Sequence, residues 1–166
     1  GARRGPTHPW AKMVPVPRSA RSNPRPTPGT TPPRWVIYLA VFVGGMLGGT
    51  TRYLVSLALP AQVGHVPWGI FAVNLVGAFL MGLLLTGWIR RGHVAHPWRP
   101  FLATGILGAF TTWSTFMADT YGLIVSRGAL VGAGYVLGAT VLGVAAAAAG
   151  WWTAHRVVPA RVPMER

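Results

Sequence analysis

The residues with the clearest chemical potential are four hydroxyl side chains inside the apolar run GILGAFTTWSTF, Gly105 to Phe116. They are Thr111, Thr112, Ser114 and Thr115, and no charged residue stands among them. Glycine costs roughly 1 kcal/mol against alanine in a helix interior, and Ser and Thr offer the backbone competing hydrogen bonds. The run therefore predicts a helix that breaks near its middle. Discontinuous helices of this kind commonly build ion-binding sites in membranes.

The chain has almost no residues that could carry out acid-base catalysis. Asp119 and Glu165 are its only acidic residues, and it contains no cysteine. Catalytic carboxylate pairs, disulfides and thiolate metal sites are therefore not expected. His93 and His96 are close in sequence, but they fall in a predicted loop and lack further metal ligands. We expect no enzyme activity.

The composition is typical of a membrane protein, because 51% of the 166 residues are hydrophobic and only 10% are charged. Soluble domains average roughly 25% charged residues. Four segments approach the ~20 apolar residues that a bilayer requires. They are residues 35–59, 68–89, 101–126 and 129–154. We predict an all-α membrane protein with four transmembrane helices, the third of them broken between Gly108 and Thr112.

Glycines in the first predicted helix form two overlapping pairs, Gly44 with Gly48 and Gly45 with Gly49. Small residues four positions apart let a second helix approach closely within a membrane. Helix packing is the simplest use of both pairs.

Residues 1–34 hold seven of the 15 Lys and Arg residues and nine of the 15 prolines, with no acid. Such a segment cannot bury enough apolar surface to fold. We predict a disordered, basic, Pro-rich cytoplasmic tail, a four-helix membrane domain at residues 35–155 and a short basic C-terminal tail at residues 156–166. Contact with anionic lipid, worth about 1 kcal/mol per basic residue, is favoured over nucleic-acid binding.

The basic residues are distributed unevenly between the two predicted faces of the membrane. Thirteen Lys and Arg residues fall on the side of the termini, whereas only Arg52 and Arg127 fall on the other side. The positive-inside rule then predicts a multi-pass protein of the cell membrane with both termini in the cytoplasm. Asp119 is expected to pair with Arg127 or Arg52 and is assigned no transport role.

Three motifs resemble those of the CrcB or Fluc family of fluoride channels. The run at residues 105–116 is similar to that family's third-helix signature, G-x-x-G-G-x-T-T-F-S-T-F. The run GGMLGGTTRY at residues 44–53 is similar to its first-helix G-G-x-x-G-A-x-x-R-Y, and NLVG at residues 74–77 is similar to its V-N-x-x-G. The motifs occur in the family's order, and the resemblance extends from Gly44 to about Trp152.

The resemblance implies a passive, fluoride-selective channel that exports fluoride, built as an antiparallel dimer. It also implies a structural sodium ion at the dimer centre, which is not transported and is held by the main-chain carbonyls of Gly108 and Thr111. The same resemblance implies a set of fluoride-pathway residues. These are Asn74, Trp113, Ser114, Thr115, Phe116, Arg52 and Tyr135.

The individual side chains admit other roles when they are taken alone. Asn74 can make an ordinary hydrogen bond between helices, and the hydroxyls of Ser114 and Thr115 can bond carbonyls one turn back. Phe116 alone is typical of a lipid-facing or core position. Arg52 either snorkels to the membrane surface or lines a wet vestibule where it concentrates anions.

The chain departs from the family pattern in two places. Trp113 stands where the motif has the first of two pathway phenylalanines. Its indole N–H can serve an anion, and its larger ring can also occlude a narrow path. Downstream of Tyr135, Ala139 and Gly143 stand where two serines are expected. Helical spacing predicts that Thr140 faces away from these two positions. One pathway is therefore predicted to be degenerate.

Two other functions fit four small membrane helices. The first is a partner subunit that completes a heterodimeric fluoride channel with an oppositely oriented sister chain. The second is a small multidrug-type exporter. An exporter needs a membrane-embedded carboxylate in its first helix, and residues 35–59 contain none.

Overall fold

The computed structural model describes residues 32–62, 64–91 and 97–159, and every regular element among them is helical. The elements are α1 (Arg34–Ala58), α2 (Trp68–Arg91), η3 (Pro100–Leu107), α3 (Gly108–Phe110), α4 (Ser114–Arg127) and α5 (Ala129–Val157). Residues 1–31, 92–96 and 160–166 lie outside the described part of the chain. The predicted tails fall largely on these ranges, as do His93 and His96.

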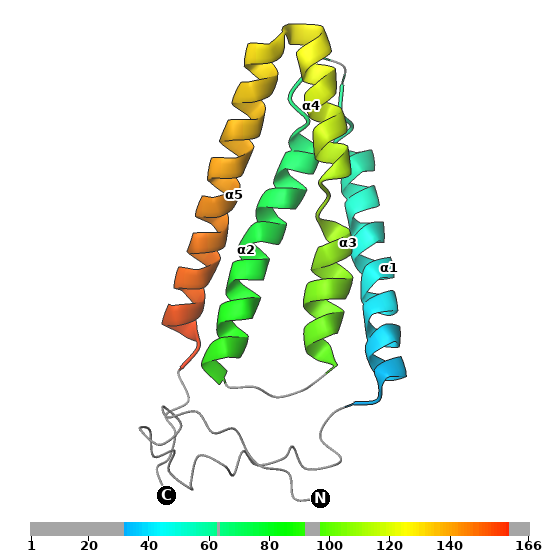
Figure 1. The fold of residues 1–166 in the computed structure, drawn as a ribbon, viewed down its shortest axis with the longest axis vertical. Coiled ribbons are helices and arrows are strands. Elements are labelled where there is room, and N and C mark those ends of the chain that lie inside the picture. The colour runs from blue at the N-terminus through cyan, green and yellow to red at the C-terminus, as the bar shows by residue number, and fades with distance from the viewer. Residues whose placement is uncertain (1–31, 63, 92–96, 160–166) are drawn as a thin grey trace, which may run out of the picture. The chain divides into compact units, whose positions relative to one another are not determined.

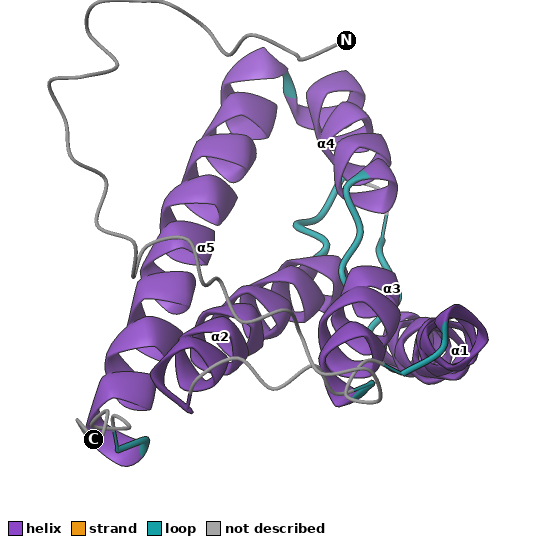
Figure 2. Cartoon of the chain, turned by 60° about the horizontal axis from the view of Figure 1, so that its bottom comes forward, coloured by secondary structure: helices purple, strands orange, loops and turns teal. Residues whose placement is uncertain are grey.

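The helices run up and down in chain order, as Figure 1 shows. The start of α1, the end of α2, the start of η3 and the end of α5 share one end of the bundle. α5 packs chiefly on α2, and α1 packs chiefly on η3, whereas α4 leans toward α5. In Figure 2, α1 and α5 lie on opposite sides of the other helices.

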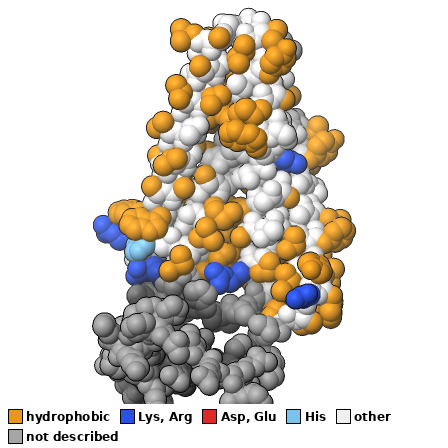
Figure 3. Space-filling view, in the orientation of Figure 1, with side chains coloured by type: hydrophobic (Ala, Val, Ile, Leu, Met, Phe, Trp, Pro, Cys, Tyr) orange, Lys and Arg blue, Asp and Glu red, His pale blue; other side chains and the backbone are white. Residues whose placement is uncertain are grey.

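Three helical segments of the described chain are long and apolar enough to cross a membrane: 68–91, 100–127 and 129–157. They confirm three of the four predicted spans. α1 has 25 residues, which is more than the ~20 that a bilayer requires. Arg34 and Arg52 reduce its apolar character, however, and it is not among these three. Many large hydrophobic side chains of the described helices are exposed, and they are spread over the face shown in Figure 3.

Glycines set the closest contacts between helices. A Cβ atom built on Gly44 or Gly48 would overlap main-chain oxygens of Phe101 and Ile106, so α1 lies directly against the backbone of η3. By contrast, nothing lies within 4 Å of a Cβ built on Gly45 or Gly49. Within this chain, therefore, only the first of the two predicted glycine pairs is used for packing.

The third membrane segment changes its helical form twice. Its first eight residues, η3, are π-helical, a form that the sequence patterns did not indicate, and Pro100 stands at its start. Ordinary helix follows over Gly108–Phe110, and residues 111–113 are then not helical. Thr111 has an extended backbone, with φ −76° and ψ 155°. The chain resumes as a helix at Ser114.

The two faces of α1 supply a matched pair of variants. Gly48→Ala should lower the free energy of unfolding by about 1–3 kcal/mol, because the new methyl group meets the main chain of Ile106, which has no rotamer to change. Gly49→Ala, its control, should leave the stability equal or higher, since alanine favours helix. Thermal unfolding in detergent measures both. Equal destabilisation by the two variants would contradict the packing described for α1.

Candidate functional site

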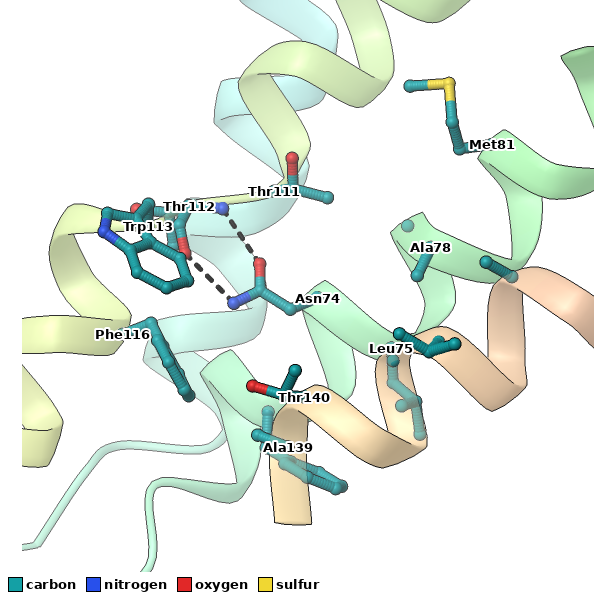
Figure 4. A pocket seen from close by; sticks show the side chains of 15 residues that line it. Asn74, Leu75, Ala78, Met81, Thr111, Thr112, Trp113, Phe116, Ala139 and Thr140 are labelled. Atoms are coloured by element: carbon teal, nitrogen blue, oxygen red, sulfur yellow. Dashed lines mark hydrogen bonds between the residues drawn. The ribbon is translucent and has the colours of Figure 1, made fainter. Parts of the chain in front are cut away.

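Asn74 of α2 makes two hydrogen bonds to the main chain of Thr112, in the non-helical segment (Figure 4). Its Nδ2 donates to the Thr112 carbonyl at 3.0 Å, and its Oδ1 accepts from the Thr112 N–H at 2.9 Å. Because one partner is a donor and the other an acceptor, only one orientation of the amide satisfies both. Asn74 thus replaces two hydrogen bonds that the interrupted helix has lost, which is the interhelical role considered for it above.

Gly77 lies one turn after Asn74 on α2 and faces the same segment. A Cβ atom on Gly77 would overlap Cγ2 of Thr111. The absence of a side chain lets α2 approach closely enough for the Asn74 amide to reach Thr112. The spacing N-x-x-G therefore combines a hydrogen-bonding group with the room that it needs.

The hydroxyl groups around the break have separate partners. Thr111 Oγ1 donates to the Leu107 carbonyl at 3.0 Å, one turn back. Thr112 Oγ1 accepts from the Thr115 N–H at 3.3 Å and contacts the hydroxyls of Ser114 and Thr115 at 3.4 and 3.2 Å. Ser114 and Thr115 therefore gather around Thr112 instead of bonding back along the helix. Thr112 stabilises the start of α4 in the manner of a capping residue.

These contacts release two carbonyl groups from their usual donors. In a continuous helix the Thr112 N–H would bond to the Gly108 carbonyl, and the Thr115 N–H to the Thr111 carbonyl. Here the first N–H bonds to Asn74 and the second to the Thr112 hydroxyl. The main-chain oxygens of Gly108 and Thr111 therefore lack the N–H donors that a continuous helix would give them.

A cavity of about 520 Å³ opens beside the break, between α2, α4 and α5. Asn74, Thr111, Trp113 and Phe116 line it, so four of the predicted site residues share one space (Figure 4). Most of the other lining residues are apolar.

Thr140 also lines this cavity, beside Ala139 and Gly143. The prediction that Thr140 faces elsewhere was therefore wrong. Neighbouring positions of a helix differ by only about 100°, and the exposed face of α5 is wide enough to present both Ala139 and Thr140. The Thr140 hydroxyl donates to the Val136 carbonyl at 2.8 Å within its own helix.

Aromatic rings form a connected row on one side of the cavity. The ring of Phe116 lies 5.5 Å from that of Trp113 and 5.1 Å from that of Tyr135, and Tyr135 lies 6.4 Å from Phe71. Phe116 and Tyr135 are buried, whereas Trp113 is 70% exposed. Phe116 is therefore part of the core of this chain and also part of the cavity wall. Trp113 has no such cover from the described helices.

The remaining predicted residues lie around this space rather than in it. Arg52 belongs to α1 and does not line the cavity, and Tyr135 packs behind Phe116. The Tyr135 hydroxyl and Oδ2 of Asp119 are buried without a hydrogen-bond partner among the described residues. The expected ion pair of Asp119 with Arg127 or Arg52 was wrong, because the described part of the chain contains no such pair.

Three contributors were not predicted: Thr112 as the anchor of the break, Gly77 as the point of close approach, and Phe71 as a ring of the row. Thr112 was noted only as one hydroxyl among several. Phe71 lies one turn before Asn74, a helical spacing that would have pointed to it. The main-chain role of Thr112 depends on a residue 38 positions away, and no local pattern reports that.

The family model described as CrcB-like protein, Camphor Resistance (CrcB), matches residues 39–151, more than half of the chain. The chain belongs to the CrcB family. The match includes the break, Asn74 and the aromatic row.

Relatives in the CrcB family cover most of the described chain. A fluoride-specific ion channel FluC of Methylobacterium nodulans is 48% identical over 109 residues, 64% of this chain and 86% of the relative. FluC 2 of Nitrobacter hamburgensis is 44% identical over 115 residues, 68% and 92% of the two chains. FluC of Desulfotalea psychrophila is 36% identical over 118 residues, 71% and 91%.

These names describe ion channels, a class of protein that is not enzymatic. The expectation from the scarcity of acidic residues agrees with this class. Membership of a CrcB channel family and three helices suited to a bilayer also establish the chain as membrane-embedded.

The hydrogen bonds of Asn74 generate a stability prediction. Asn74→Ala should lower the free energy of unfolding by about 1–3 kcal/mol for each buried main-chain group of Thr112 left without a partner. Amide hydrogen exchange at Thr112 should accelerate in the same variant. Thr140→Ala is the matched control, because Thr140 lines the same cavity but its hydroxyl bonds only within α5. Unchanged exchange at Thr112 in Asn74→Ala would show that the amide does not hold the break.

Proposed function

We propose that this chain is a subunit of a fluoride-selective ion channel that exports fluoride passively and so lowers its concentration in the cytoplasm. The observation that carries the proposal is the broken helix beside the cavity, where an amide, hydroxyl groups and aromatic rings meet. The printed names of its relatives support the same ion. Figure 4 shows how Asn74, the Thr112 main chain and Phe116 lie together.

Fluoride is small, strongly hydrated and a strong hydrogen-bond acceptor, so a dry path must replace its water with donors. Asn74 supplies one such donor, because its Nδ2 carries two N–H groups and only one of them donates to the Thr112 carbonyl. Tyr135 supplies another through its unpartnered hydroxyl. The positive edges of Trp113 and Phe116 also face an anion favourably.

The hydroxyls of Ser114 and Thr115 complete the pathway at the start of α4. Both side chains are exposed in this chain and adjoin the Thr112 hydroxyl, so they can rotate to donate to a passing anion. Arg52, on α1, is assigned to the mouth of the path. Its positive charge there would raise the local anion concentration.

A structural sodium ion is proposed at the break, held by the main-chain oxygens of Gly108 and Thr111. The fit rests on the two carbonyls that have lost their helical donors to Asn74 and Thr112. Carbonyl oxygens suit a hard cation of this size. The ion would supply positive charge at the break and takes no part in transport.

The proposed assembly is an antiparallel dimer in which α1 is the fourth membrane span of each subunit. α1 lies along the backbone of η3 and so accompanies a segment that is itself suited to the bilayer. Glycines with nothing within 4 Å, such as Gly134 and Gly138 on α5, leave a face on which a second subunit can pack.

A heterodimer is the second candidate, and the charge distribution favours it. Thirteen basic residues against two give this chain one strongly preferred orientation, with both termini cytoplasmic, whereas an antiparallel homodimer requires both orientations. Trp113 and the missing hydroxyls at Ala139 and Gly143 further suggest that one pathway depends on a sister subunit. A multidrug-type exporter is disfavoured, since α1 has no carboxylate.

Fluoride efflux from liposomes tests the proposed function. The purified chain is reconstituted alone and with any sister subunit, and fluoride and chloride release are recorded under a set membrane potential. We expect electrogenic fluoride flux without a proton requirement and without chloride flux. Fluoride flux that needs a proton gradient would indicate an exporter. No fluoride flux in either preparation would contradict the proposed channel function.

Trp113→Phe should raise the fluoride flux of the isolated protein by about tenfold. Overpacking typically costs about 1–3 kcal/mol, and a tenfold change in rate corresponds to about 1.4 kcal/mol. Trp151→Phe, an equal change outside the cavity, serves as the control. Strong flux from the unmodified chain, reduced by Trp113→Phe, would show instead that the indole is a working donor, and the case for a sister subunit would weaken.

The orientation is measured by reporter fusions. A reporter at the C-terminus should give only a cytoplasmic signal, and one inserted after Gly64, in the connection between α1 and α2, only an external signal. The asymmetry of basic residues is the physical reason. Equal signals on both sides for both fusions would support a dual-topology homodimer.

A further inference from the structure

Four arginines form a basic rim at the end of the bundle where α2 and α5 end and η3 begins. They are Arg90, Arg91, Arg99 and Arg156, referred to below as the basic rim. In Figure 3 the blue side chains concentrate toward this end of the described helices. The rim is separate from the break at residues 111–113, and none of its arginines is among the proposed pathway residues.

Three of the rim arginines are held by specific contacts. The guanidinium of Arg99 lies 5.2 Å from the ring centre of Trp88, and that of Arg156 lies 4.6 Å from that of Trp152. Arg90 donates from Nε to the Val158 carbonyl at 2.7 Å and so joins the ends of α2 and α5.

These contacts leave terminal N–H groups of the three guanidinium groups without a hydrogen-bond partner among the described residues. A guanidinium over a ring engages the ring with its face, and its edge keeps the N–H groups that pair with phosphate. Arg90 uses only Nε for Val158, so both of its terminal nitrogens remain. The three side chains are therefore partly ordered before any ligand arrives.

No carboxylate of the described chain neutralises the rim. Asp119 is the only acidic residue among the described residues, and it belongs to α4, beyond the break. Trp88 and Trp152 stand near the ends of helices suited to the bilayer, where indole rings mark the headgroup level. The compensating negative charge at this depth is most directly supplied by lipid.

We propose that the basic rim is a binding site for the phosphate of an anionic phospholipid, and that Arg90, Arg99 and Arg156 recognise it through charge-assisted hydrogen bonds. An anionic headgroup such as phosphatidylglycerol neutralises the positive charge of the rim arginines and carries no positive charge of its own. A phosphocholine headgroup carries an ammonium group that competes with the guanidinium groups. None of the rim contacts involves a residue of the proposed fluoride pathway.

Quenching of tryptophan fluorescence by brominated lipids tests the proposal, because Trp88 and Trp152 lie within the rim. The full chain is reconstituted in phosphatidylcholine containing brominated phosphatidylglycerol or, in parallel, brominated phosphatidylcholine. We expect the anionic lipid to bind at least about tenfold more strongly, given about 1 kcal/mol for each basic residue at the surface. The preference should fall as salt is raised.

Three variants make the test specific. Arg156→Gln should remove most of the preference, and Arg156→Lys should retain part of it, since lysine keeps the charge but not the fork of donors. Arg127→Gln, at the opposite end of the bundle, should retain all of it. Equal loss in Arg156→Gln and Arg127→Gln, or no preference in the unmodified chain, would overturn the proposal.

A free-anion site is distinguished by adding inorganic phosphate at constant ionic strength. The lipid site predicts that tens of millimolar phosphate leave the quenching by brominated phosphatidylglycerol unchanged. Displacement of the lipid by phosphate at that level would overturn the lipid assignment in favour of a soluble anion. Glu165→Gln should also leave the preference unchanged, and a several-fold rise would show that this carboxylate, outside the described residues, already neutralises the rim.

Discussion

The site depends on one constraint, which is that the main-chain groups of a broken helix must find hydrogen-bond partners at membrane depth. The amide of Asn74 supplies two of these partners to Thr112, and the Thr112 hydroxyl supplies a third to the start of α4. Gly77 allows the approach that these bonds require. The break is thus stabilised by polar contacts from a neighbouring helix, and the carbonyls of Gly108 and Thr111 lose the donors that a continuous helix would give them.

The other features of the site follow from that arrangement. Because residues 111–113 leave the helix, α4 starts in a new direction and leans toward α5 (Figure 1). Phe116 therefore meets Tyr135, and the cavity opens beside Phe116. The exposed Trp113 marks the side that this chain leaves uncovered. In the proposed dimer, that uncovered side is where a second subunit would complete the path.

Much of the architecture was predictable from the sequence, for physical reasons that differ between elements. α2 and α5 are long apolar runs, so their positions followed from hydrophobicity, and the glycines and hydroxyls of residues 105–116 indicated a weak helix. The π-helical start at η3, the two partners of Asn74 and the place of Thr140 were not foreseen. Each of these features depends on contacts between distant segments or on the width of a helix face. The dimer, the sodium ion and the fluoride pathway stay predictions.

The central claim is that fluoride passes the broken helix through the donors and rings gathered there. Its most direct test is solid-state NMR of the conducting protein in lipid, with dipolar transfer measured between fluoride and carbon-13 in labelled Thr, Asn and Phe residues. We predict transfer to Asn74, Thr115 and the ring of Phe116, lost when fluoride is replaced by chloride. Fluoride flux accompanied by transfer only to residues away from the break would contradict the account.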